Sequence, residues 1–246
     1  MNLKDKFEIA SGTVIGRDHR VAGKNNQDSF YFQATDELIA AVVCDGCGSS
    51  PHSEVGAKIG ARTAVIAVQE LFESRFAAKN QPCSKDEWTR FIEGIGSKIH
   101  MTLYELIKKF AEKSPENFYD KAAKIISDYF LFTIVGFVVT PFDTAIFSIG
   151  DGLYSLNGDI RQLGPFPDNA PPYLAYDLVI DRTRQCAEYE AFKFHWLIPT
   201  PEIRSMMIGT DGVADFTEVA EKNLPGRAEL VGPLSQFWDN YLYFRN

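Results

Sequence analysis

The chain has 246 residues, 45% of them hydrophobic and 24% charged, which is typical of a globular protein that can bury a full core. Its net charge of −8 excludes a general nucleic-acid binder, because such proteins collect phosphates with a positive field. The longest apolar run, Tyr129 to Val139, is far shorter than the ~20 residues of a membrane helix, and the acidic N-terminus lacks the apolar core of a signal peptide. We therefore expect a single cytoplasmic domain over residues 1–246, with no membrane segment and no nucleic-acid partner.

The first part of the chain predicts three strands around a polar loop. Residues 7–15 read as the first strand, and the glycine-broken polar stretch 17–28 reads as a loop. Ser29 to Phe32 and the continuous apolar run 38–43 predict two neighbouring antiparallel strands. Asp28 precedes one of these strands and Asp45 follows the other, so we expect both carboxylates at the same edge of the sheet.

Three helices follow. The period becomes helical over residues 53–76, with an expected buried stripe that includes Val55, Ile59, Val65 and Ile66. Ser84 and Glu87 form a capping box for a second helix. Pro115, after Ser114, is expected in the first turn of a third helix. We interpret the apolar stripes of these helices as core and not as a cofactor site.

The second half of the chain is rich in predicted strands. A hairpin is expected at the turn Asn157-Gly158-Asp159, and residues 213–223 predict a short helix. The expected strands are Phe130 to Thr140, Thr144 to Ile149, Leu153 to Leu156, Ile160 to Leu163, Tyr176 to Ile180, Ala191 to Ile198 and Arg204 to Ile208.

Asp-Gly steps recur at the ends of apolar strands, at Asp45, Asp151 and Asp211. A single Asp-Gly step favours a simple turn, but three such steps after buried strands favour a common site. Carboxylates gathered at one sheet edge repel one another unless a cation offsets them. Oxygen ligands without His or Cys select hard ions, so the pattern predicts Mg²⁺ or Mn²⁺, and two such ions roughly 4 Å apart can activate water and clamp a phosphoryl group.

In their order along the chain, these motifs resemble the metal-dependent type 2C serine/threonine protein phosphatases, in a bacterial form. The resemblance covers residues 7 to about 220 and is carried by Asn26-Gln27-Asp28, Val43-Cys44-Asp45-Gly46-Cys47-Gly48 with Gly56-Ala57, Phe132-Thr133-Ile134-Val135, Ile149-Gly150-Asp151-Gly152 and Thr210-Asp211-Gly212. It implies an α+β fold in four layers, in which two antiparallel β-sheets pack as a sandwich with helices on both outer faces.

The resemblance also implies the chemistry and its residues. Asp45 would bridge two Mg²⁺ or Mn²⁺ ions, with the backbone carbonyl of Gly46 as a ligand of one of them. Asp211 would bind the second ion, Asp28 would support the first ligand shell, and Asp151 would help to hold a third ion. The implied reaction is hydrolysis of phosphoserine and phosphothreonine in phosphoproteins by a metal-bridging hydroxide, without a phosphoenzyme.

Two positions in the polar loop depart from the pattern of the family. Gln27 stands where the family usually has an acidic residue, and Gly23 stands where it usually has an arginine. A neighbouring basic residue would then meet the substrate phosphate. The candidates are His19, Arg20 and Lys24, with Arg17 as a further one; the alternative is that they are solvated loop charges.

The C-terminus also departs from the family, which ends on a strand opened by a metal-binding Asp. Here only Asp239-Asn240 could serve, and Asp239 follows Asp211 by 239 − 211 = 28 residues, a short connection. We therefore expect a domain truncated before the final metal-binding strand. This expectation leaves open a catalytically impaired module that binds phosphoprotein without turnover. A redox or zinc site at Cys44 and Cys47 is a further, weaker alternative.

Overall fold

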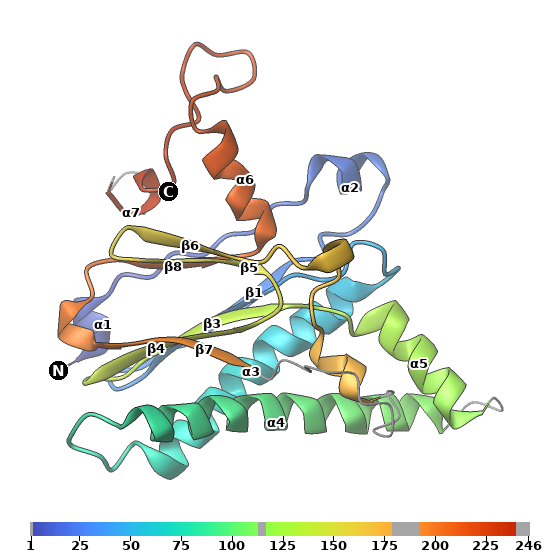
Figure 1. The fold of residues 1–246 in the computed structure, drawn as a ribbon, viewed down its shortest axis with the longest axis horizontal. Coiled ribbons are helices and arrows are strands. Elements are labelled where there is room, and N and C mark those ends of the chain that lie inside the picture. The colour runs from blue at the N-terminus through green and yellow to red at the C-terminus, as the bar shows by residue number, and fades with distance from the viewer. Residues whose placement is uncertain (1, 113–116, 179–191, 240–246) are drawn as a thin grey trace.

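The computed structural model describes residues 2–112, 117–178 and 192–239 (Figure 1). Two antiparallel sheets stack on each other, as the sequence predicts. The larger sheet has the order β1-β2-β3-β4-β7 and consists of Ser29–Ala34, Ile39–Cys44, Ile134–Val139, Asp143–Ile149 and Lys193–Pro199. The smaller sheet has the order β6-β5-β8 and consists of Asp159–Leu163, Gly152–Leu156 and Met206–Gly209.

The centre of the larger sheet is buried on both faces. Every residue of β4 is buried, and β3 is buried except for the half-buried Phe137. Helices cover one face, and β5 and β8 of the smaller sheet contact the other through β3. This double burial explains why residues 134–139 read as a continuous apolar run instead of an alternating one.

The larger sheet is covered by the helices α3 (Ser53–Arg75), α4 (Lys85–Ala111) and α5 (Phe118–Tyr129). The capping box at the start of α4 is confirmed: the Ser84 hydroxyl accepts the Glu87 N–H, and the Glu87 carboxylate accepts the Ser84 N–H. None of the helices in the described ranges is long and apolar enough to span a bilayer. The prediction of Pro115 in the first turn of α5 is wrong, because Asn117 is the N-cap of this helix and accepts the Tyr119 N–H. Ser114 and Pro115 themselves lie outside the described residues.

The expected apolar stripe of α3 is partly wrong. Val55 and Ile66 are exposed, whereas Val65 is fully buried. The face that meets the sheet consists mainly of small residues, including Gly56, Ala57, Gly60, Ala61 and Ala64. A Cβ on Gly60 would lie 2.2 Å from the Phe132 ring, so close approach of the helix to the sheet requires residues without bulk there.

The outer face of the smaller sheet is covered by α6 (Asp211–Val219), which contacts β5 and β8. α7 (Gln236–Asp239) follows, and Phe216 of α6 packs edge-on against Phe237 of α7. The two sheets are also linked by a polar contact, because Trp196 Nε1 of β7 donates to the Tyr154 hydroxyl of β5 at 2.9 Å. The predicted α+β fold with two antiparallel sheets and covering helices is confirmed.

The prediction of a first strand over residues 7–15 is wrong. The chain begins with α1 (Leu3–Lys6), continues without a strand to α2 (Arg17–Val21), and α2 lies within the stretch predicted as a loop. Phe7 and Ile9 do pack against the Leu3, Ile39 and Val139 cluster, which explains the alternating pattern. Gly12, Thr13 and Val14 are exposed, so the second half of this segment has no buried face to pair on.

The prediction of a strand at residues 176–180 is also wrong in its described part, which belongs to the 3-10 helix η2 (Leu174–Leu178). The rings of Tyr173 and Tyr176 pack edge-on at 5.3 Å at this turn. The rest of the predicted strand, residues 179 and 180, lies outside the described residues. Two further short 3-10 turns are η1 (Pro167–Asn169) and η3 (Thr200–Glu202).

Candidate metal centre

Asp28 and Asp45 meet because of the register between β1 and β2. Ser29 pairs with Cys44, so the residue before β1 and the residue after β2 lie at the same edge of the sheet. The side chains of Asp28 and Asp45 are in hydrogen-bonding contact. The prediction that these two neighbouring strands bring both carboxylates to one edge is confirmed.

Asp211 reaches the same place from the smaller sheet. β8 ends at Gly209, Thr210 is the N-cap of α6, and Asp211 is the first residue of that helix. The Asp211 carboxyl is in hydrogen-bonding contact with Asp45, and the Thr210 hydroxyl donates to Asp28 Oδ2 at 3.2 Å. Asp45 thus lies between two carboxyl groups supplied by different sheets.

Asp151 is placed by the sharp connection between β4 and β5. Gly150 and Gly152 on either side have φ values of +86° and +132°, which L side chains rarely adopt. Burial, followed by the charge of Asp211, raises the pKa of Asp151. Asp151 therefore lies at the periphery of the group formed by Asp28, Asp45 and Asp211.

The electrostatics of this group are unfavourable when all its members are ionised. Burial, followed by the charges of Asp28 and Asp211, raises the pKa of Asp45 to about 10. Burial also raises the pKa of Asp28, although contacts with Asp45 and Thr210 oppose the shift. Carboxyl groups that are partly removed from water and in mutual contact hold protons that solvated carboxyl groups would release at neutral pH.

The backbone after Asp45 approaches its neighbours closely. A Cβ on Gly46 would lie 2.8 Å from both the Gln27 carbonyl oxygen and Ser53 Oγ, so only glycine fits without displacement. Gly46 forms a bridge opposite Phe132 that is made by Thr133 N–H to the Asp45 carbonyl and Cys47 N–H to the Leu131 carbonyl. The amide groups of Gly46 itself are not used in this bridge.

The donor set fits a hard divalent cation in its chemistry. It consists of the half-buried carboxyl groups of Asp28 and Asp45 and the exposed carboxyl group of Asp211, whose mutual repulsion a cation would offset, with the backbone oxygen of Gly46 beside them. Within the described ranges, no three His, Cys, Asp or Glu side chains already form a complete group of metal ligands. A cation bound by these carboxyl groups would replace the protons that they hold.

The basic residues of the polar loop occupy different positions. The Lys24 ammonium donates to the Gly48 carbonyl at 2.9 Å, next to the turn that follows Asp45. His19 is half-buried on α2, and its positive charge opposes the rise in the Asp28 pKa. Arg17 and Arg20 are exposed on the same short helix.

The C-terminal candidate, Asp239, is the last residue of α7, where its N–H donates to the Ser235 carbonyl. The strand-like residues after it, Tyr241 to Phe244, lie outside the described residues. Sequence reasoning missed the contribution of Thr210 and Ser53, whose hydroxyl groups bond to Asp28 Oδ2 and to the Cys47 carbonyl. Both residues precede or begin helices, where a hydroxyl is ordinarily read as a cap.

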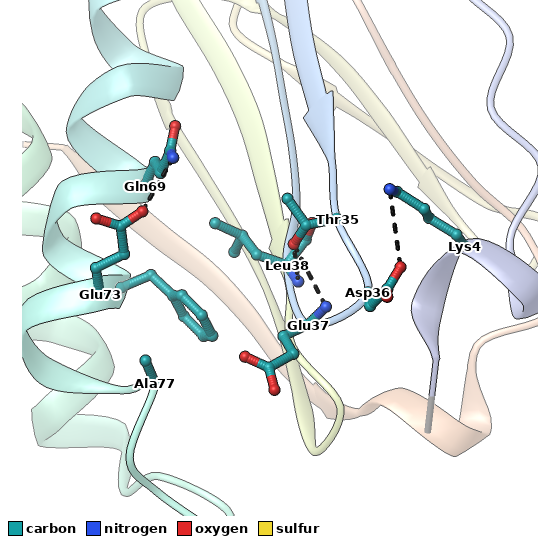
Figure 2. Close-up of a pocket in the computed structure, with 9 residues that line it drawn as sticks. Lys4, Thr35, Asp36, Glu37, Leu38, Gln69, Glu73 and Ala77 are labelled. Atoms are coloured by element: carbon teal, nitrogen blue, oxygen red, sulfur yellow. Dashed lines mark hydrogen bonds and ion pairs between the residues drawn. The ribbon is translucent and has the colours of Figure 1, made fainter.

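A cleft of about 430 Å³ lies at the other end of the β1–β2 hairpin (Figure 2). Figure 2 shows Gln69 and Glu73 of α3 on one side, the turn Thr35 to Leu38 in the middle, and Lys4 of α1 beyond it. Asp28 and Asp45 sit at the opposite end of strands of six residues, about 20 Å away. This cleft is therefore separate from the carboxylate group.

This chain is similar to known protein phosphatases. The protein phosphatase 2C family profile matches residues 15–242. Among solved structures, the serine/threonine phosphatase Stp1 from Staphylococcus aureus is 17% identical with a TM-score of 0.48, and the match covers 83% of this chain and 76% of that one. Serine-threonine phosphatase 2C from Toxoplasma gondii is 15% identical with a TM-score of 0.48, and the match covers 80% of this chain and 78% of that one. No curated protein matches. Since the family profile spans most of the sequence, the chain belongs to the protein phosphatase 2C family.

Proposed function

We propose that the protein hydrolyses phosphoserine and phosphothreonine in phosphoproteins, with two Mg²⁺ or Mn²⁺ ions held by Asp45, Asp28 and Asp211. The observation that carries this proposal is the contact of the half-buried Asp45 carboxyl with two other carboxyl groups from separate sheets. Such an arrangement costs free energy unless a cation compensates it. Family membership supports the reaction class.

Each residue has a definite part in the proposed site. Asp45 would contact both ions, Asp211 and Asp28 would complete the carboxylate set, and the Gly46 carbonyl would add a backbone oxygen. When bound, the two ions would activate a water molecule and offset the charge of the phosphoryl group. Thr210 fixes the Asp28 carboxylate by its hydrogen bond, and Asp151 would help to hold a third ion.

We propose His19, Arg20 and Lys24 as the residues that meet the substrate phosphate. His19 acts electrostatically on Asp28, which supports a position close to the carboxylates. Lys24 already donates to the Gly48 carbonyl, so it can stabilise the turn after Asp45 as well as attract phosphate. Arg20 is exposed on α2, and within the described residues its side chain forms no such hydrogen bond.

A second candidate function is a phosphoprotein-binding module with an impaired metal site. Two observations favour it. The amide of Gln27 takes the place of an acidic side chain and bonds to protein acceptors, and no group of three metal ligands is already formed within the described chain. Such a module would bind a phosphopeptide through the basic loop without turning it over.

The test is Mn²⁺-dependent hydrolysis of p-nitrophenyl phosphate and of a phosphothreonine peptide by the full chain. We expect Asp45→Asn to lower the rate on the order of 100- to 1000-fold, because it removes the carboxylate at the centre of the site. Asp36→Asn is the matched control, since it removes a carboxylate at the far end of the same hairpin. Phosphopeptide binding without turnover at saturating Mn²⁺ would favour the binding module, and a rate unaffected by Asp45→Asn would exclude the proposed site.

A further inference from the structure

The side chain of Gln27 is buried beside the candidate site and bonds to the loop that follows Asp45. Gln27 is only 3% exposed. Its Nε2 lies 3.2 Å from the Cys47 carbonyl, 3.0 Å from the Ser50 carbonyl and 2.7 Å from Ser53 Oγ. One amide group from the residue before Asp28 thus joins both ends of the turn that carries residues 47–53.

The chemistry of these partners requires a donor at position 27. Two of the three are carbonyl oxygens, which can only accept, so a flipped amide would place oxygen against oxygen. Gln27 Oε1 is buried and has no hydrogen-bond partner within the described residues. An unpaired buried acceptor costs free energy, so the retained contacts of Nε2 must outweigh that cost.

The Cys47 carbonyl is the point at which these bonds converge. It accepts from Gln27 Nε2, from the Ser53 hydroxyl at 2.9 Å and from the Ser50 N–H at 3.0 Å. This fixes the peptide group one residue beyond Gly46. On the other side, the Cys47 N–H is held by the Leu131 carbonyl at 2.9 Å. The backbone on the C-terminal side of Gly46 is therefore fixed through both amide groups of Cys47.

We propose that Gln27 is a positioning residue, which acts as a hydrogen-bond donor on the 47–53 turn and thereby sets the backbone oxygen of Gly46 relative to the carboxylates. This inference rests on the proposed function, because the position of the Gly46 oxygen matters only if the site holds cations. We call the three hydrogen bonds from Gln27 Nε2 to the 47–53 turn the clamp, and the clamp itself does not depend on bound cations. Position 27 then contributes through geometry and not through charge.

A role of position 27 through charge and a role through geometry predict opposite changes in Mn²⁺ binding for one substitution. Gln27→Glu adds a carboxylate next to Asp28, so a role through charge predicts tighter cation binding. A role through geometry predicts weaker binding, because a carboxylate faces two carbonyl oxygens and repels the turn. We expect Gln27→Glu to weaken Mn²⁺ binding about tenfold by titration calorimetry, the scale of a lost supporting contact.

Asn26→Asp is the matched control for added charge. This substitution adds a carboxylate at the residue before Gln27. Its Oδ1 can still accept the Asp28 N–H, as Asn26 Oδ1 does at 3.2 Å. We expect this variant to bind Mn²⁺ at least as tightly as the unmodified protein. Tighter binding by Gln27→Glu, equal to that of Asn26→Asp, would overturn the positioning role.

A metal-free measurement separates this inference from the proposed function. Hydrogen exchange of the Ser50 amide, which donates to the Cys47 carbonyl, reports directly on the turn. We expect exchange about tenfold faster in Gln27→Glu, and also faster in Gln27→Met, an uncharged variant that keeps the length and tests the clamp if the glutamate variant does not fold. Unchanged exchange in either folded variant would overturn the clamp. Absence of Mn²⁺ binding by the unmodified protein would instead overturn the proposed function and the consequence for Gly46.

Discussion

The two ends of the β1–β2 hairpin carry carboxylates in opposite environments. At the turn, Asp36 pairs with Lys4 at 3.7 Å, and the two side chains are 65% and 53% exposed, so water screens the charges. At the other end, Asp28 and Asp45 are half-buried and in contact with each other, and Asp45 also contacts Asp211. Carboxylates in the same hairpin are thus screened by water at one end and repel one another at the other. Under the proposed function, a bound cation would offset the repulsion at the second end.

The largest expected effect is on the pH dependence of stability of the metal-free protein. The pKa of Asp45 is about 10 in the folded state, far above its value of 3.8 in the unfolded chain. Between these two values the folded state binds one more proton than the unfolded state, so stability is greatest below pH 4 as far as this group is concerned and falls as pH rises toward 10. We expect the free energy of unfolding to fall by about 2–4 kcal/mol between pH 5 and pH 8, measured by urea denaturation with a chelator present.

Mn²⁺ should reverse this trend, because cation binding requires deprotonated carboxylates. We expect saturating Mn²⁺ to raise the unfolding midpoint more at pH 8 than at pH 5. Asp45→Asn should flatten the metal-free pH dependence, whereas Asp36→Asn should leave it unchanged. A metal-free protein whose stability rises from pH 5 to pH 8 would contradict the contrast between the two ends of the hairpin.

The next effect concerns the tight backbone at the buried end. Gly46→Ala places a Cβ 2.8 Å from the Gln27 carbonyl and Ser53 Oγ, within a turn that several hydrogen bonds hold in place. We expect a loss of about 2–3 kcal/mol in the free energy of unfolding, the cost of overpacking a site that cannot relax freely. Chemical denaturation measures it directly.

Gly48→Ala is the control for this substitution. Gly48 lies two residues further along the same loop, and a Cβ there would meet no atom within 4 Å. We expect a change of at most about 0.5 kcal/mol. Equal losses in the two variants would show that the loop penalises any added side chain, and that close packing at Gly46 is not the reason for its glycine.

This contrast also shows how far the sequence could predict the site. Asp28 was predicted to share a sheet edge with Asp45 because Asp28 precedes one of two neighbouring antiparallel strands and Asp45 follows the other. The capping box fixed the start of α4 for the same local reason. Local sequence patterns therefore predicted those features that are determined by residues close together in the chain.

Properties that depend on distant partners were not predictable in this way. The segment 7–15 alternates like a strand, yet half of it is exposed and it forms no ladder. The buried face of α3 is made of alanine and glycine because Phe132 and the sheet lie close, which the apolar periodicity of Val55 and Ile66 does not reveal. The donor role of Gln27 depends on carbonyl groups 20 and 23 residues away, so the family resemblance suggested only a missing acid at this position.

The smallest effect is expected at the exposed end of the hairpin. Asp36→Asn removes the ion pair with Lys4, and exposed pairs of this kind contribute about 0.2–1 kcal/mol because water and salt screen them. The turn itself is held by other groups, since Thr35 Oγ1 accepts the Leu38 N–H at 2.9 Å and the Glu37 N–H at 3.3 Å (Figure 2). We expect the free energy of unfolding of Asp36→Asn to differ from that of the unmodified protein by no more than this amount, and the difference to shrink as the salt concentration rises. Mn²⁺-dependent hydrolysis should be unchanged. A loss of activity in Asp36→Asn would mean that the two ends of the hairpin are coupled, since a carboxylate about 20 Å from the site has no direct contact through which to act.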